Sequence, residues 1–131
     1  MRSIHVSRVI AAAPGDVYAY AADPDNLRAW ASGLARSEVT RDGDTLVVDS
    51  PMGRVRVRFV ARNTLGVLDH DVTLPSGEVV TNPVRVLAHP DGSEVVFTVR
   101  QLGQTDDEFA RDVDAVRADL DRLAALVEHD A

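Results

Sequence analysis

A run of about 24 residues at the C-terminal end of the chain predicts one long helix with a single apolar face. Thr105-Asp106-Asp107-Glu108 reads as a capping box, with acidic residues placed at the positive end of the helix. The apolar residues that follow recur at spacings of four and three: Phe109, Val113, Val116, Leu120, Leu123 and Val127. Such a helix has to bury its apolar stripe against a second layer of structure.

The second layer is predicted by segments in which apolar and polar residues alternate. Ser3–Ile10 is the first predicted strand, and six more follow from Arg36 onward: Arg36–Arg41, Thr45–Ser50, Arg54–Arg62, Gly66–Leu74, Glu78–His89 and Ser93–Arg100. Turn signals such as Asp42-Gly43-Asp44 and Pro90-Asp91-Gly92 separate them. Because these connections are short, consecutive strands are expected to pair antiparallel.

Two short helices are predicted between the first strand and the rest. Ala13-Pro14-Gly15-Asp16 opens the first helix, and Asp23-Pro24-Asp25 ends it, because a residue before proline avoids the helical region. The second covers about Asp25 to Trp30. The expected fold class is therefore α+β: one domain over residues 1–131, with a seven-stranded curved antiparallel sheet around the long C-terminal helix. A sheet wider than its helix has to curl, and the curl predicts an internal pocket.

Composition restricts the possible partners. The formal net charge is -7 and every one of the 14 basic residues is arginine, so binding of nucleic acid through bulk charge is disfavoured. There is no cysteine, no apolar run like a signal peptide, and none of the length of a membrane span. We expect a cytoplasmic protein, monomeric or homodimeric, without a membrane span.

Two segments near the N-terminus carry a family resemblance. Val9-Ile10-Ala11-Ala12-Ala13-Pro14-Gly15-Asp16-Val17-Tyr18 and Ala22-Asp23-Pro24-Asp25-Asn26-Leu27-Arg28-Ala29-Trp30 resemble the N-terminal signature of the START-like helix-grip superfamily (SRPBCC), in its polyketide cyclase/dehydrase-like branch. The order of predicted elements matches that fold over essentially the whole chain. The superfamily contains cyclases, lipid carriers, hormone receptors and co-chaperones, so the resemblance implies a fold more than a function.

His70 is the most informative candidate site residue. It shares strand parity with Leu68, Val72 and Leu74, while Asp69 and Asp71 lie on the other face. The apolar set is expected to face inward, which takes the imidazole to the concave side. There it can bind a ligand hydroxyl or act as a general acid or base, or it can be a core histidine with a backbone partner.

Four further residues complete the candidate ligand-binding set. Trp30 follows the second helix, where the resembling families have the pocket mouth, although a core position is an equal alternative. Asn82 shares parity with inward-facing valines, and the neighbouring Pro83 predicts a bulge or an edge position. Tyr20 and Phe97 are the remaining candidates.

Other charged groups are interpreted as non-functional. In Asp69-His70-Asp71 the side chains alternate between faces, so they cannot converge on one ion, and no metal or other cofactor is expected. Arg54, Arg56 and Arg58 alternate with apolar residues and are expected on the solvated outer face. A two-residue turn at Asn63-Thr64 would place Arg58 opposite Asp69 and Arg56 opposite Asp71.

Three function classes stay open from the sequence. The first is binding of a small hydrophobic ligand in the cavity between the sheet and the C-terminal helix. The second, implied by the resemblance, is a polyketide cyclase or dehydratase-like enzyme acting on a small apolar substrate. The third is a co-chaperone-like module for protein interaction. Whether the chain catalyses a reaction is left open, and a small apolar molecule is the expected partner.

Overall fold

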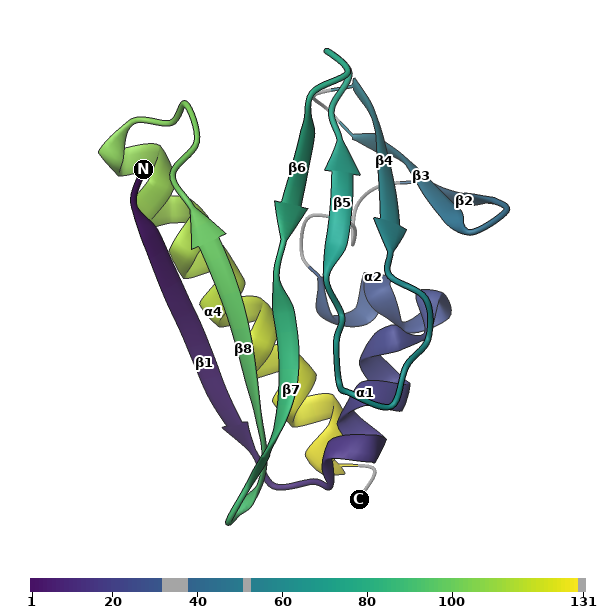
Figure 1. Cartoon of the computed structure of the whole chain (residues 1–131), viewed down its shortest axis with the longest axis vertical. Coiled ribbons are helices and arrows are strands. Elements are labelled where there is room, and N and C mark those ends of the chain that lie inside the picture. The colour runs from purple at the N-terminus through teal and green to yellow at the C-terminus, as the bar shows by residue number, and fades with distance from the viewer. Residues whose placement is uncertain (32–37, 51–52, 130–131) are drawn as a thin grey trace.

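The computed structural model describes residues 1–31, 38–50 and 53–129, and Figure 1 shows their arrangement. The elements run in this order: β1 Ser3–Ile10, α1 Pro14–Ala22, the 3₁₀ turn η1 Pro24–Asn26, α2 Leu27–Trp30, β2 Glu38–Asp42, β3 Thr45–Ser50, β4 Gly53–Phe59, β5 His70–Thr73, β6 Val79–Asn82, β7 Val84–His89, β8 Gly92–Arg100 and α4 Asp106–His129. The first two residues of the strand predicted at Arg36–Arg41 lie outside the described part.

The strands form two antiparallel sheets. The eight strands of the described residues divide into a three-stranded sheet, in the order β1-β8-β7, and a five-stranded sheet, in the order β2-β3-β4-β5-β6. The α+β class and the antiparallel pairing are confirmed, but the prediction of one seven-stranded sheet was wrong. The difference arises at Pro83, which divides the predicted strand Glu78–His89 into β6 and β7.

Pro83 also explains why the two sheets separate. Extending the β7–β8 register by one residue places Pro83 opposite Thr98, whose N–H donates to the Pro83 carbonyl at 3.0 Å. Proline has no N–H to donate in return, so the ladder ends there and β6 leaves β8. Figure 1 shows the two strands diverging from this point. The sheets stay joined near Val67, which forms an isolated bridge with Arg85.

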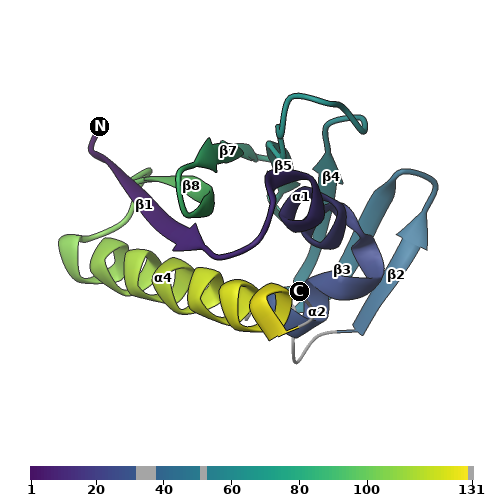
Figure 2. The same cartoon turned by 90° about the horizontal axis from the view of Figure 1, so that it is seen from below.

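The long helix α4 packs chiefly across the small sheet, against β1 and β8 (Figure 2). Its predicted apolar stripe is confirmed, because Phe109, Leu120 and Leu123 are at most 1% exposed. The capping box is confirmed as well. The Thr105 N–H donates to Glu108 Oε1 at 3.0 Å, and the Glu108 N–H donates to Thr105 Oγ1 at 3.2 Å.

The short helices lie beside α4, and α1 also packs against β7 and β8 of the small sheet. Pro14 begins α1, as predicted, and Asp23 ends it in extended backbone. The Asp23 carboxylate then accepts the Asp25 N–H at 3.0 Å and so caps η1. The next helix, α2, packs against α4, where Arg122 Nε donates to the Trp30 carbonyl at 3.3 Å.

The loop between β4 and β5 corrects the predicted pairing of charges. The predicted turn at Asn63-Thr64 is instead part of a longer connection, in which Asn63 hydrogen-bonds to both the N–H and the carbonyl of Val67. The register therefore moves by two residues, and Arg58 lies opposite Asp71 while Arg56 lies opposite Thr73. A two-residue shift preserves parity, so the arginines still face solvent as predicted.

Candidate functional site

An aromatic and polar cluster lies on the inner face of the five-stranded sheet. Phe59, His70 and Asn82 are directly opposite one another on β4, β5 and β6. The Phe59 ring stacks on the imidazole with centroids 4.7 Å apart, and Phe97 of β8 meets the imidazole edge-on at 5.9 Å. Phe97 belongs to the other sheet, so the cluster bridges the opening between the two sheets.

The hydrogen bonds around His70 assign the tautomer of its neutral ring. Nδ1 lies 3.1 Å from the Leu68 carbonyl, which only accepts hydrogen bonds, so Nδ1 carries the proton. In the neutral ring, Nε2 is then a bare acceptor, and Asn82 Nδ2 lies 3.4 Å from it. The amide nitrogen of Asn82 therefore faces the imidazole, and its carbonyl oxygen is left to accept a hydrogen bond from another group.

Electrostatics favour this neutral form. Burial lowers the pKa of His70 below its ordinary value of 6.5, because a charged imidazole would lose its hydration. The Leu68 carbonyl and the carboxylates of Asp69 and Asp71 act in the opposite direction but do not reverse the shift. At neutral pH the inner face thus presents an uncharged imidazole.

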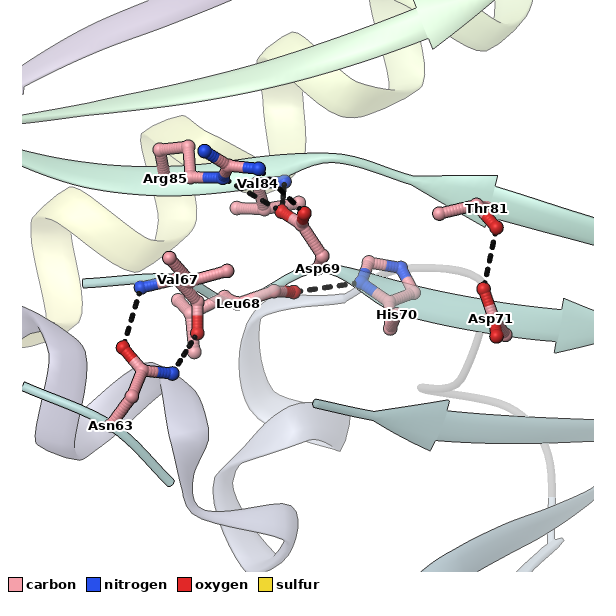
Figure 3. Close-up of polar contacts among 9 residues, drawn as sticks. All are labelled: Asn63, Val67, Leu68, Asp69, His70, Asp71, Thr81, Val84 and Arg85. Atoms are coloured by element: carbon pink, nitrogen blue, oxygen red, sulfur yellow. Dashed lines mark hydrogen bonds and ion pairs between the residues drawn. The ribbon is translucent and has the colours of Figure 1, made fainter. Parts of the chain in front are cut away.

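Asp69 and His70 together replace one backbone hydrogen bond next to the Val67–Arg85 bridge, which joins the two sheets (Figure 3). The Leu68 N–H donates to the Val84 carbonyl at 2.8 Å, but the Val84 N–H donates to Asp69 Oδ1 at 2.9 Å instead of returning to Leu68. The freed Leu68 carbonyl accepts the imidazole N–H. The break in the ladder is therefore the feature that orients the histidine ring.

An ion pair on the outer face holds this break in place. Arg85 donates to Asp69 in bidentate fashion, through Nε at 2.9 Å and Nη2 at 2.7 Å. This hydrogen bonding keeps the pKa of Asp69 below its ordinary value. On the next outward position, Thr81 Oγ1 donates to Asp71 Oδ1 at 2.5 Å. The carboxylates of Asp69 and Asp71 thus both form their hydrogen bonds on the outer face, as strand parity predicted.

A groove of about 400 Å³ adjoins the cluster, between the inner face of β5 and β6 on one side and β8 with the start of α4 on the other. Val72, Val80 and Val99 supply apolar walls, and Asn82 lies in the lining. The groove is open to solvent, and its outer end is polar, with Gln104 and Asp112 hydrogen-bonded to each other at 3.2 Å. The groove lies beside the large sheet, on the face that α4 does not cover because α4 packs chiefly against β1 and β8.

The structure brings together three of the five predicted site residues. His70, Asn82 and Phe97 meet in the cluster. Trp30 lies elsewhere, 5% exposed on α2, and its indole Nε1 has no hydrogen-bond partner among the described residues. Tyr20 lies on α1 and packs against the core.

Sequence reasoning missed Phe59 as a site residue. Its parity with Val55 and Val57 placed it on the inner face, but the predicted two-residue turn would have set it opposite Leu68 instead of His70. A register error of two residues therefore concealed the ring stacking. Within residues 1–31, 38–50 and 53–129, no three histidine, aspartate or glutamate side chains are grouped as metal ligands.

The fold and this inner-face site define an α+β protein in which two antiparallel sheets and a long C-terminal helix border an open groove. A family profile described as "Polyketide cyclase / dehydrase and lipid transport" matches residues 1–128. The chain therefore belongs to this family, as its N-terminal signature predicted. No curated protein matches the chain.

Solved structures with the same fold are distant in sequence. The Aha1 dimer from Colwellia psychrerythraea is 16% identical, with a TM-score of 0.77, covering 98% of this chain and 97% of that one. Protein CV1439 from Chromobacterium violaceum is 18% identical, with a TM-score of 0.72 and coverages of 98% and 99%. DynU16, a protein in the dynemicin biosynthetic locus, is 14% identical with a TM-score of 0.72, and the match covers 96% of this chain but 47% of DynU16.

At these identities the likeness concerns the fold alone.

No helix in the described part of the chain is both long and apolar enough to cross a membrane.

Proposed function

We propose that this protein binds a small apolar molecule in the groove beside β6, and that the molecule carries one hydrogen-bond donor such as a hydroxyl group. The observation that carries the proposal is the position of Asn82, which lines the groove while its amide nitrogen faces His70. This arrangement leaves one oriented acceptor beside the apolar side chains of Val72, Val80 and Val99, while Glu78, Arg100, Gln104 and Asp112 supply the polar part of the lining. Small-molecule sites typically combine an apolar surface with a few polar groups that fix the orientation of the ligand.

The dimensions and lining of the groove support this reading. A volume of about 400 Å³ falls within the usual range for ligand sites, roughly 300–1,000 Å³. Val72, Val80 and Val99 come from both sheets, so a ligand would bury apolar surface against each of them. Asn82 connects the groove to the cluster, in which Phe97 meets His70 edge-on.

The test is a titration with N-phenylnaphthylamine, an uncharged apolar fluorophore with one N–H donor. Val79 and Val80 are neighbours on β6 with opposite orientations: Val79 is 56% exposed, and Val80 lines the groove. Val80→Gln should weaken binding about tenfold, because burial of a valine-sized surface contributes about 1.5 kcal/mol. Val79→Gln is the matched control and should leave the affinity unchanged.

Native mass spectrometry of freshly purified protein would identify the natural ligand. A bound mass in the wild-type protein that is absent from Val80→Gln but present in Val79→Gln would support the proposal. Equal effects of the two variants on fluorophore binding would overturn it, because only one of the two side chains reaches the groove.

The neutral imidazole gives a second candidate function, a cyclase or dehydratase-like activity. The family description and the locus of DynU16 are consistent with this class. His70 has a lowered pKa and an unprotonated Nε2, the form that a general base needs at neutral pH. Nitrobenzisoxazole, which opens its ring when a base removes a proton, is a suitable probe. If His70 is the general base, turnover of this probe should fall about 10²–10⁴-fold in His70→Leu. An unchanged rate in His70→Leu would exclude His70 as the general base and would favour ligand binding without catalysis.

A further inference from the structure

A second hollow, separate from the groove, lies at the end of the five-stranded sheet. It has a volume of about 420 Å³ and is formed by the β2–β3 turn, the end of β4 with the residues that follow it, and the junction of α1 with η1. The proposed function uses none of these segments except the end of β4. The segments are far apart in sequence, so the hollow is a product of the tertiary fold.

Three arginines line this hollow: Arg41 from β2, Arg58 from β4 and Arg62 from the following loop. Arg41 is paired with Asp25 at 3.2 Å. Arg58 and Arg62 form no ion pair with any residue in the described ranges, although the Arg62 guanidinium lies 5.8 Å from the centre of the Tyr18 ring. Asp44 is the single acidic residue of the lining, so the hollow is locally cationic in a chain whose net charge is -7.

The outer-face arginines of β4 differ in how they are engaged. Arg54 pairs with Asp49 at 3.1 Å, and Arg56 pairs with Asp42 at 2.6 Å. Arg58, the next in the series, lies opposite Asp71 in the register, but the carboxylate of Asp71 accepts from Thr81. No described carboxylate forms an ion pair with Arg58, which also lines a smaller outer-face hollow with Asp69, Asp71 and Thr81.

The floor of the hollow is apolar. Ala22, Leu46, Phe59 and Ala61 contribute to the lining, and Leu46 is 5% exposed. Because β4 ends at Phe59, these apolar side chains of the inner face and Arg58 of the outer face border the same end of the strand. This combination is complementary to a molecule with an apolar body and an anionic end. Arginine is well suited to carboxylate, phosphate and sulfonate groups because its planar fork donates two parallel hydrogen bonds.

We propose that this hollow is a binding site for an organic anion, whose apolar body rests on Leu46 and Phe59 and whose anionic group is held by Arg58 and Arg62. The site stands apart from the groove proposed for an uncharged ligand. Phe59 is the point of contact between the two regions, because its ring also stacks on His70.

The experiment compares two probes that differ in one charged group. Anilinonaphthalene sulfonate has the same aromatic frame as N-phenylnaphthylamine plus a sulfonate, so the pair separates binding of the charge from binding of the apolar body. In a double variant, Arg58→Gln with Arg62→Gln, the affinity for the sulfonate should fall about tenfold or more, since hydrogen bonds to charged groups are the stronger kind. Affinity for the neutral probe should stay within about twofold.

Arg54→Gln is the matched control, because it removes an arginine from the same strand and face outside the hollow. It should leave both affinities unchanged. Amide chemical shifts measured by NMR locate the bound sulfonate: Gly43, Asp44 and Ala61 should move, and Val80 and Gln104 should not.

Two outcomes would overturn the proposal. One is a sulfonate affinity that is equally reduced by Arg54→Gln, which would indicate attraction by surface charge alone. The other is a set of shifts confined to Val80 and Gln104, which would place the anion in the groove. Neither outcome bears on the groove proposal, whose test uses the neutral probe.

Discussion

Replacement of Leu120 by alanine is the most direct measure of how strongly α4 is held against the sheet. Leu120 is 1% exposed and lies in the stripe that packs chiefly against β1 and β8. Leucine and alanine have similar helix propensities, so the substitution changes packing while leaving the helix itself nearly unaffected.

The expected loss is about 2–5 kcal/mol, made up of lost apolar transfer and of the cavity that the rigid surroundings cannot close. For 131 residues, an unfolding entropy of about 2.1 cal/mol/K per residue gives about 0.28 kcal/mol/K. A loss of 3 kcal/mol therefore lowers Tm by about 11 °C. Such a change is a large fraction of the roughly 5–15 kcal/mol that stabilises an ordinary domain.

Urea denaturation of the wild-type and variant proteins measures the difference directly. Leu65→Ala is the matched control, because the same atoms are removed from a side chain that is 78% exposed. Its effect should stay below about 0.5 kcal/mol. If Leu120→Ala cost no more than Leu65→Ala, α4 would not be packed as described, and the enclosing architecture would have to be abandoned.

Two further predictions concern backbone geometry and pH. Gly66 has φ +73° and an added Cβ would lie 2.3 Å from the Val86 carbonyl oxygen, so Gly66→Ala should cost at least about 2 kcal/mol in urea denaturation. Gly15→Ala, where the added Cβ meets nothing within 4 Å, should cost nothing, and equal losses would argue against this contact. For His70, the lowered pKa means that the unfolded chain binds a proton first, so the free energy of unfolding should fall as pH drops below about 6.5. Denaturation curves at about pH 7.5 and 5.5 should show this loss in the wild-type protein and less of it in His70→Leu; equal losses would mean that His70 is not buried neutral.

Local patterns in the sequence were sufficient for the long helix and for the facing of side chains along a strand. The capping box at Thr105 and Glu108 depends on residues three apart, and the stripe of α4 depends on one helical repeat. Parity along β5 likewise placed His70 inward with respect to Asp69, because neighbouring side chains of a strand point to opposite faces. These features follow from interactions within a few residues, which the chain order itself specifies.

The assembly of the site was decided by long-range pairing. Strand parity survives a shift of two residues, so the sequence could not distinguish Leu68 from His70 as the partner of Phe59. The hydrogen bonds of Asn63 within the β4–β5 loop decided that register. The sequence showed that Pro83 could interrupt a strand. Whether it did depended on β8 lying beside it, because the missing N–H ends a ladder only where a neighbouring strand would accept it. The sequence by itself thus determined which residues face inward, and the tertiary structure determined which of them meet, because contacts between strands are set by loop geometry that no local pattern encodes.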